Sequence, residues 1–149
     1  INILYDGQVS EMNLNALNCA VVAGIMKRAN PVVNMVSAPV VAREKGIQIS
    51  TTNQDKSGVF DGYVKVTVVT EKRERSIAGT VFSDGKPRFI QIKGINIEAE
   101  VGAHMLYTTA KGEAIALLYI DGPLPEKALK DLRDTGLFKQ VKELEFEVA

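Results

Sequence analysis

The sequence predicts an α+β fold, and two kinds of hydrophobic periodicity indicate it. Residues 13–28 carry apolar side chains at the spacing of an amphipathic helix. Elsewhere, short runs alternate apolar and polar residues, as in 64–68, where three valines alternate with Lys65 and Thr67. Short turns such as Asp84-Gly85 between alternating runs are typical of antiparallel hairpins. Helices and mostly antiparallel strands are therefore expected in one chain.

The first half of the chain predicts one strand and two helices. Residues 1–9 alternate as a half-buried strand that Gly7 interrupts. The helix over 13–28 has Asn13 as its expected N-cap and two basic residues at its C-terminal end. A shorter helix should begin at Ser37, with Pro39 in its first turn, and end at Gly46.

Strands are expected to follow at 47–51, 64–68, 76–82, 88–93 and 95–100, the last three as a meander. The small residues at 101–103 suggest a domain boundary there. The tail then predicts a βαβ-like pattern: strands at 105–107 and 114–120, a helix over 125–132 and a final strand over 144–148.

Composition excludes several classes of function. Lys+Arg and Asp+Glu are balanced at 18 each, so no overall charge attracts nucleic acid or an anionic membrane. No stretch approaches the ~18 apolar residues that a transmembrane helix needs. We therefore expect a cytoplasmic protein without nucleic-acid or membrane partners. Because the chain opens inside a strand pattern without a Met, we interpret it as a fragment.

Catalytic and metal-binding motifs are absent from the sequence. Cys19 is the one cysteine and lies in an apolar run, which favours a buried structural thiol over a nucleophile. His104 is the one histidine, so no pair of histidines exists for a metal. There is no glycine-rich nucleotide motif and no nucleophile elbow. We expect no catalytic residue, no metal site and no cofactor in this chain.

One candidate site remains, and it is an anion site. Ser37 opens a helix, and helix N-termini present free N–H groups and the positive end of a dipole. Four basic residues could supply side-chain charge, and arginine can bind a phosphate or carboxylate with two hydrogen bonds. The candidate anion- or effector-binding residues are Arg88, Lys93, Arg43, Lys45 and Ser37. The alternative is that these residues are ordinary solvated surface charges.

Two stretches of the sequence resemble a known family. VNMVSAPVVAREKGI, followed by RSIAGTVFSDGKPRFIQIKGINIEAE, resembles the allosteric substrate-binding (ASB) domain of long-form D-3-phosphoglycerate dehydrogenases. HMLYTT with GEAIALLYIDGPLPEKALKDLRDTGLFKQVKELEFEV resembles the ACT domain that follows it in those enzymes. The resemblance implies an ASB-type α/β domain with an antiparallel meander at 1–101 and a partial ferredoxin-like ACT domain at 102–149.

The resemblance also implies a function. The parent enzyme would oxidise 3-phosphoglycerate with NAD as the first committed step of L-serine biosynthesis, and its catalytic domains would precede Ile1. The ASB domain would bind a phosphorylated hydroxy acid or another anion, and the ACT domain would bind L-serine at a subunit interface of a homo-oligomer. Arg88 matches a basic position of the family's anion site, whereas two other basic positions of that site fall on Glu100 and Tyr119.

The ACT-like tail departs from the family pattern at one point. An ACT domain reads βαββαβ, but here Thr109 runs directly into Ala110 with no first helix and no second strand. The missing part carries much of the serine-binding loop, so no serine-binding residue is assigned. We expect a break at this point, with the Cα atoms of Thr109 and Ala110 much farther apart than the 3.80 Å of a trans peptide.

Two other functions fit the same sequence. Iron–sulfur L-serine dehydratases carry a related ASB-like domain and an ACT domain, although the length of the meander fits the dehydrogenase better. The chain could also be a purely structural oligomerisation module, whose exposed sheet edges pair between copies.

Overall fold

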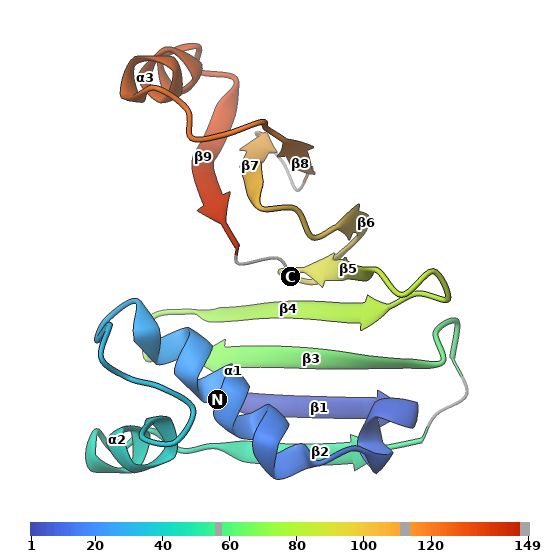
Figure 1. Ribbon diagram of the computed structural model, residues 1–149. Helices are drawn as coiled ribbons and strands as arrows, with labels where there is room; N and C mark the ends of the chain where they lie inside the picture. The colour runs from blue at the N-terminus through green and yellow to red at the C-terminus, as the bar shows by residue number, and fades with distance from the viewer. Residues whose placement is uncertain (56–57, 111–113, 147–149) are drawn as a thin grey trace. The chain divides into compact units, whose positions relative to one another are not determined.

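The computed structural model describes residues 1–55, 58–110 and 114–146. They form two compact units, Ile1–Val81 and Phe82–Ala149, and Figure 1 traces the elements along the chain. Both units combine helices with mostly antiparallel strands, which confirms the predicted α+β class.

The first unit is organised around a strand that is paired on both edges. Strand β1 (Asn2–Gly7) pairs in parallel with β2 (Ser50–Gln54) and antiparallel with β3 (Gly62–Val69), and β3 pairs antiparallel with β4 (Glu74–Val81). The order within this unit is therefore β2-β1-β3-β4. Ile3 and Tyr5, which share one face of β1, are almost fully buried.

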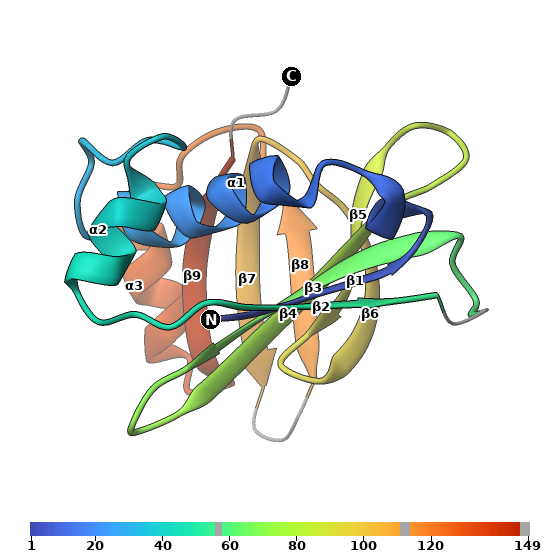
Figure 2. The same cartoon turned by 90° about the horizontal axis from the view of Figure 1, so that it is seen from below.

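The parallel pairing of β1 with β2 requires a crossover, and the helices provide it. The chain passes from β1 through a 3-10 turn (Gln8–Glu11), helix α1 (Leu14–Lys27) and helix α2 (Ala38–Glu44) before it enters β2. Figure 2 shows both helices on the same side of these strands. Asn13 caps α1 as predicted, because its side chain accepts a hydrogen bond from the backbone N–H of Ala16 at 3.2 Å.

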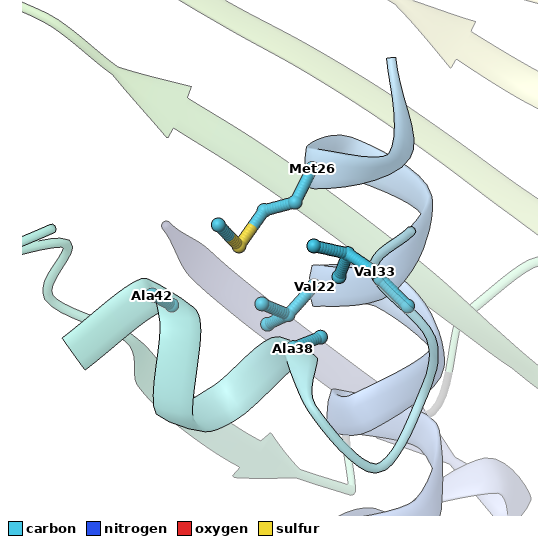
Figure 3. Close-up of a cluster of buried hydrophobic side chains, with 6 residues drawn as sticks. Val22, Met26, Val33, Ala38 and Ala42 are labelled. Carbon is cyan, nitrogen blue, oxygen red and sulfur yellow. The ribbon is translucent and has the colours of Figure 1, made fainter. Parts of the chain in front are cut away.

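Small side chains let the two helices pack closely. Ala38 and Ala42, one turn apart on α2, are completely buried against Val22 and Met26 of α1 and Val33 of the connecting loop (Figure 3). Residues four apart lie on the same face of a helix, so both alanines meet α1. These residues form the hydrophobic core between the two helices.

The predicted cap of the second helix needs a correction. Ser37 precedes α2, but its side chain makes no capping bond to the helix. Asn34 orders this turn instead: its side-chain oxygen accepts hydrogen bonds from the backbone N–H groups of Val36 and Ser37. The Ser37 hydroxyl accepts from the backbone N–H of Asn34 at 3.1 Å. Ser37 therefore fixes the loop before the helix rather than the helix terminus.

The second unit contains a hairpin and a three-stranded sheet. Strands β5 (Pro87–Ile92) and β6 (Ile95–Glu100) are antiparallel and joined by the two-residue turn Lys93–Gly94. Both turn residues have positive φ angles, 52° and 81°, as the type I′ turns of hairpins require.

The three-stranded sheet has the order β8-β7-β9 and is entirely antiparallel. Its strands are β7 (His104–Ala110), β8 (Ile115–Tyr119) and β9 (Phe138–Glu145), and helix α3 (Glu126–Asp134) connects β8 to β9. This order and direction are those of a ferredoxin-like βαββαβ sheet without its first helix and second strand. The predicted partial ferredoxin-like tail therefore has the expected topology.

Three predictions about the strands were wrong in their details. Strand β7 continues through Thr109 and Ala110, so the expected break between these residues does not exist. The second strand lies at Ser50–Gln54 rather than 47–51, because the parallel register with β1 selects those residues. The final strand begins at Phe138 and not at 144, because its whole length pairs with β7; Val148 lies outside the described residues.

In the part of the chain that the structure describes, no helix is long and apolar enough to span a membrane.

The turn after β1 provides a test of backbone packing. Gly7 has φ +71°, and a Cβ atom there would overlap the carbonyl oxygen of Asp61. Gly46 has nearly the same φ, +70°, but open space around it. We expect Gly46→Ala to lower the free energy of unfolding by about 1 kcal/mol for the left-handed backbone alone. Gly7→Ala should lower it by about 3 kcal/mol, because the steric overlap adds to that cost.

Chemical denaturation of the two variants measures the difference directly. Equal losses at the two positions would show that the strand turn at Gly7 tolerates the extra carbon.

Candidate functional site

The structure divides the predicted anion-binding residues between the two compact units. Ser37, Arg43 and Lys45 belong to the first, whereas Arg88 and Lys93 belong to the second. In the first unit, Ser37 precedes α2, while Arg43 lies in its last turn and Lys45 follows its end. At about 1.5 Å of rise per residue, the two cations lie at the opposite end of the helix from its free N–H groups. The structure does not gather these three residues into one site.

Arg88 is held by a ring of carboxylates. It lies on β5 directly opposite Glu100 of β6. Its guanidinium donates two hydrogen bonds to Asp84, at 3.0 and 2.6 Å, and lies 3.9 Å from carboxylate oxygens of both Glu98 and Glu100. It also stacks 4.3 Å above the ring of Phe82. Arg88 is therefore mostly covered, with its side chain only 16% exposed.

The electrostatics of this cluster do not favour an anion. Lys86 pairs with Glu100 at 3.0 Å, so three carboxylates surround two cations. The hydrogen bond from Arg88 lowers the pKa of Asp84 from 3.8 to about 2, and the same bond raises the pKa of Arg88. A phosphate or carboxylate at Arg88 would compete with Asp84 for the guanidinium.

Tyr119 is one of the two residues, with Glu100, at which the sequence resemblance implied a basic position that this chain does not have. Its hydroxyl donates a hydrogen bond to the backbone carbonyl of Glu100 at 2.6 Å. Burial raises the pKa of Tyr119, and the nearby charge of Glu100 raises it further. Tyr119 and Glu100 thus join β8 to β6 within the second unit.

Lys93 has a different environment from Arg88. Its ammonium donates a hydrogen bond to the side-chain oxygen of Gln140 on β9 at 3.0 Å and lies 5.0 Å from the centre of the Tyr107 ring on β7. Among the described residues, no carboxylate lies within 4.0 Å of it. Within the second unit, Arg88 therefore has ion-pair partners, whereas Lys93 has none among the described residues.

Sequence reasoning missed the polar residues that surround Lys93. Tyr107 and Thr109 are 7% and 9% exposed, and the hydroxyl group of each is buried without a hydrogen-bond partner among the described residues. We call Lys93, Tyr107, Thr109, Gln140 and Lys142 the β7 polar cluster. Three hydroxyl residues follow one another in HMLYTT, which was the available signal.

Among the described residues, neither Cys19 nor His104 has the neighbours that a catalytic nucleophile or a metal ligand would need. Cys19 is a free, partly buried thiol on α1. His104 begins β7, and its Nδ1 atom is buried with no hydrogen-bond partner in the described part of the chain. Within those same residues, no three histidine, cysteine or acidic side chains are grouped as a metal ion would need.

Comparison with known proteins shows the family. Residues 1–93 match the D-3-phosphoglycerate dehydrogenase intervening domain. The chain belongs to this family. It is 24% identical to the D-3-phosphoglycerate dehydrogenase of Bacillus subtilis (strain 168), over 95% of this chain and 33% of that protein. It is 22% identical to the D-3-phosphoglycerate dehydrogenase of Synechocystis, over 89% of this chain and 30% of that protein. The chain spans about a third of the length of these relatives.

The lengths of these matches agree with a shortened chain. The Bacillus subtilis match extends over 174 residues, whereas 95% of 149 residues is about 142. About 30 positions of the relative therefore have no counterpart here. The Synechocystis match, over 165 residues and 89% of this chain, gives about the same difference. A missing helix and strand would account for a deficit of this size.

Acid titration tests the pairing of Asp84 with Arg88. Because the pKa of Asp84 falls from 3.8 to about 2 on folding, the pair stabilises the fold above pH 3.8. That stabilisation is lost as the pH falls through this range towards 2. The melting temperature of the wild type should therefore exceed that of Asp84→Asn by a constant amount above about pH 5, and the difference should vanish below about pH 2.

Asn at position 84 keeps an oxygen for the backbone N–H of Lys86, so the turn itself is preserved. Added salt should reduce the difference at neutral pH, because Asp84 is exposed. A difference independent of pH would contradict the ion pair.

Proposed function

We propose that this chain is the non-catalytic regulatory segment of an NAD-dependent D-3-phosphoglycerate dehydrogenase of L-serine biosynthesis. The match of residues 1–93 to the intervening domain of that enzyme carries the proposal. The coverage of about a third of each relative supports it, because the remaining two thirds are available for catalysis. The absence of a glycine-rich nucleotide motif and of a nucleophile elbow in the sequence agrees with a segment that modulates chemistry performed elsewhere.

Assembly is part of this proposal, with a second copy of the chain as the partner. Strand β8 is at the edge of its sheet, and its outer backbone groups have no strand partner among the described residues. Leu118 and Tyr119 on this strand are 52% and 57% exposed. Exposed edge strands with apolar residues favour pairing with another chain. Effector binding between copies would then couple ligand to activity.

A chimeric enzyme tests the regulatory role. We expect the Bacillus subtilis enzyme to keep its dehydrogenase activity when this chain replaces the third that it matches, but to change its response to L-serine and phosphate. The isolated chain should neither bind NAD nor reduce phosphohydroxypyruvate. Steady-state kinetics with and without each effector give the readout, and the enzyme truncated before the replaced third is the control.

Turnover by the purified chain above a mock preparation would contradict the non-catalytic assignment. A chimera whose response to both effectors equals that of the truncated enzyme would contradict the regulatory one.

The competition between Asp84 and an anion at Arg88 gives a second test. We expect 3-phosphoglycerate to raise the melting temperature of Asp84→Asn more than that of the wild type, because the variant removes the carboxylate that accepts two hydrogen bonds from Arg88. The double variant Asp84→Asn/Arg88→Gln should lose this extra shift. Differential scanning fluorimetry at constant ionic strength measures all three proteins. Equal shifts in the wild type and Asp84→Asn would exclude Arg88 as an anion ligand.

A further inference from the structure

The β7 polar cluster lies on a single face of the three-stranded sheet. Successive side chains of a strand point to opposite faces, so Tyr107 and Thr109 share one face of β7. The antiparallel register places Lys142 opposite Tyr107 and Gln140 opposite Thr109 on β9. Residues directly opposite each other share a face, with Cβ atoms about 5 Å apart. Lys93 reaches the same place from the β5–β6 turn, since its ammonium contacts both Gln140 and the Tyr107 ring.

Two features of this cluster are costly to the folded chain. The buried hydroxyl groups of Tyr107 and Thr109 have no partner among the described residues. Buried polar groups are nearly always hydrogen-bonded, because an unsatisfied one loses its bonds to water without replacement. Lys93 is the second feature: among the described residues it is the one non-glycine with a positive φ, 52°. A side chain in this conformation is strained, and glycine or asparagine would fit better.

The unsatisfied hydroxyl groups and the strained Lys93 all carry hydrogen-bond donors, which can bind the oxygens of an anion. Each hydroxyl group can donate one hydrogen bond, and the ammonium of Lys93 has N–H groups left after its bond to Gln140. Two positive charges, Lys93 and Lys142, lie at this face, and no described carboxylate forms an ion pair with either. Arg88 on the same hairpin is the contrast, because its charge is already neutralised.

We propose that the β7 polar cluster binds a small oxyanion, whose charged oxygens accept hydrogen bonds from Lys93, Tyr107 and Thr109. A carboxylate and a phosphate share this chemistry, and Lys142 adds charge for either. The arrangement makes Lys93, and not Arg88, the principal cation of an effector site in this chain. The inference rests on the proposed regulatory function for its purpose, but binding itself is measurable on the isolated chain.

Titration of the chain with glycolate and with inorganic phosphate, each against sodium chloride at equal ionic strength, tests this site. We expect one of the two anions to give saturable shifts of the Tyr107 ring resonances in NMR spectra. Lys93→Asn keeps a residue that tolerates positive φ but removes the charge, and it should weaken binding by about tenfold or more. Lys130→Gln on α3 removes the same charge outside the cluster and should leave the dissociation constant unchanged.

Two conservative variants separate a binding role from a structural one. Tyr107→Phe and Thr109→Val each delete one orphaned hydroxyl and change little else. Each should weaken anion binding, yet leave the melting temperature of the free chain unchanged or higher, because no internal hydrogen bond is lost. A structural role for the hydroxyl groups would instead lower the melting temperature.

The outcomes decide the proposal in both directions. Shifts with glycolate alone identify a carboxylate ligand, and shifts with phosphate alone identify a phosphorylated one. No saturable shift with either anion beyond that of sodium chloride overturns the site, as does unaltered binding in Lys93→Asn. Loss of the site would leave the chimera experiment unaffected, so the failure of this inference is distinguishable from that of the proposed function.

Discussion

Each unit of this chain is organised around a buried strand whose backbone is hydrogen-bonded on both edges. Strand β1 lies between β2 and β3, and β7 lies between β8 and β9. A strand paired on both sides has fixed register, and a shift of one residue would move every side chain to the other face. Tyr5 on β1 and Met105 on β7 are both fully buried. The helices then pack on the faces of the sheets that these strands leave uncovered.

The same constraint explains why two cations of one hairpin have different roles. Arg88 lies within the ladder of β5 and β6, so the register itself brings Glu100 opposite to it. Lys93 lies in the turn, outside the ladder of β5 and β6, and its side chain contacts Gln140 of β9 and the Tyr107 ring of β7. Neutralisation of Arg88 and availability of Lys93 are therefore consequences of position in the hairpin, although both residues are basic and close in sequence.

The sequence predicted the elements better than it predicted their partners. Periodicity located α1 and β3 within a few residues, and the cap at Asn13 was correct, because these signals are local. The parallel pairing that selects Ser50–Gln54 depends on a contact nearly 50 residues away along the chain, and the pattern of β2 alone does not contain it. The start of β9 at Phe138 was missed for the same reason, since its pairing with β7 overrides a weak local alternation.

The candidate site was predictable only in part, again for a physical reason. A basic residue is conspicuous in any sequence, so Lys93 and Arg88 were both identified, but neither reveals whether a carboxylate lies beside it. The run of three hydroxyl residues in HMLYTT was a signal, but threonine and tyrosine are ordinary strand residues, so the run does not show that the hydroxyl group of Thr109 is buried. Only the register of β7 with its two neighbours shows that it is buried.

Burial changes the effect of such a hydroxyl group on the stability of the fold. An exposed hydroxyl group is satisfied by water, whereas a buried one without a partner destabilises the fold at a position where valine would pack as well. A strained backbone at Lys93 adds a second cost beside the first. If these destabilising features lay in different parts of the fold, each would need its own explanation. Here the unsatisfied hydroxyl groups and the strained backbone lie at one face of one sheet, next to positive charge that has no ion pair among the described residues. A ligand that supplies the missing acceptor oxygens explains them together.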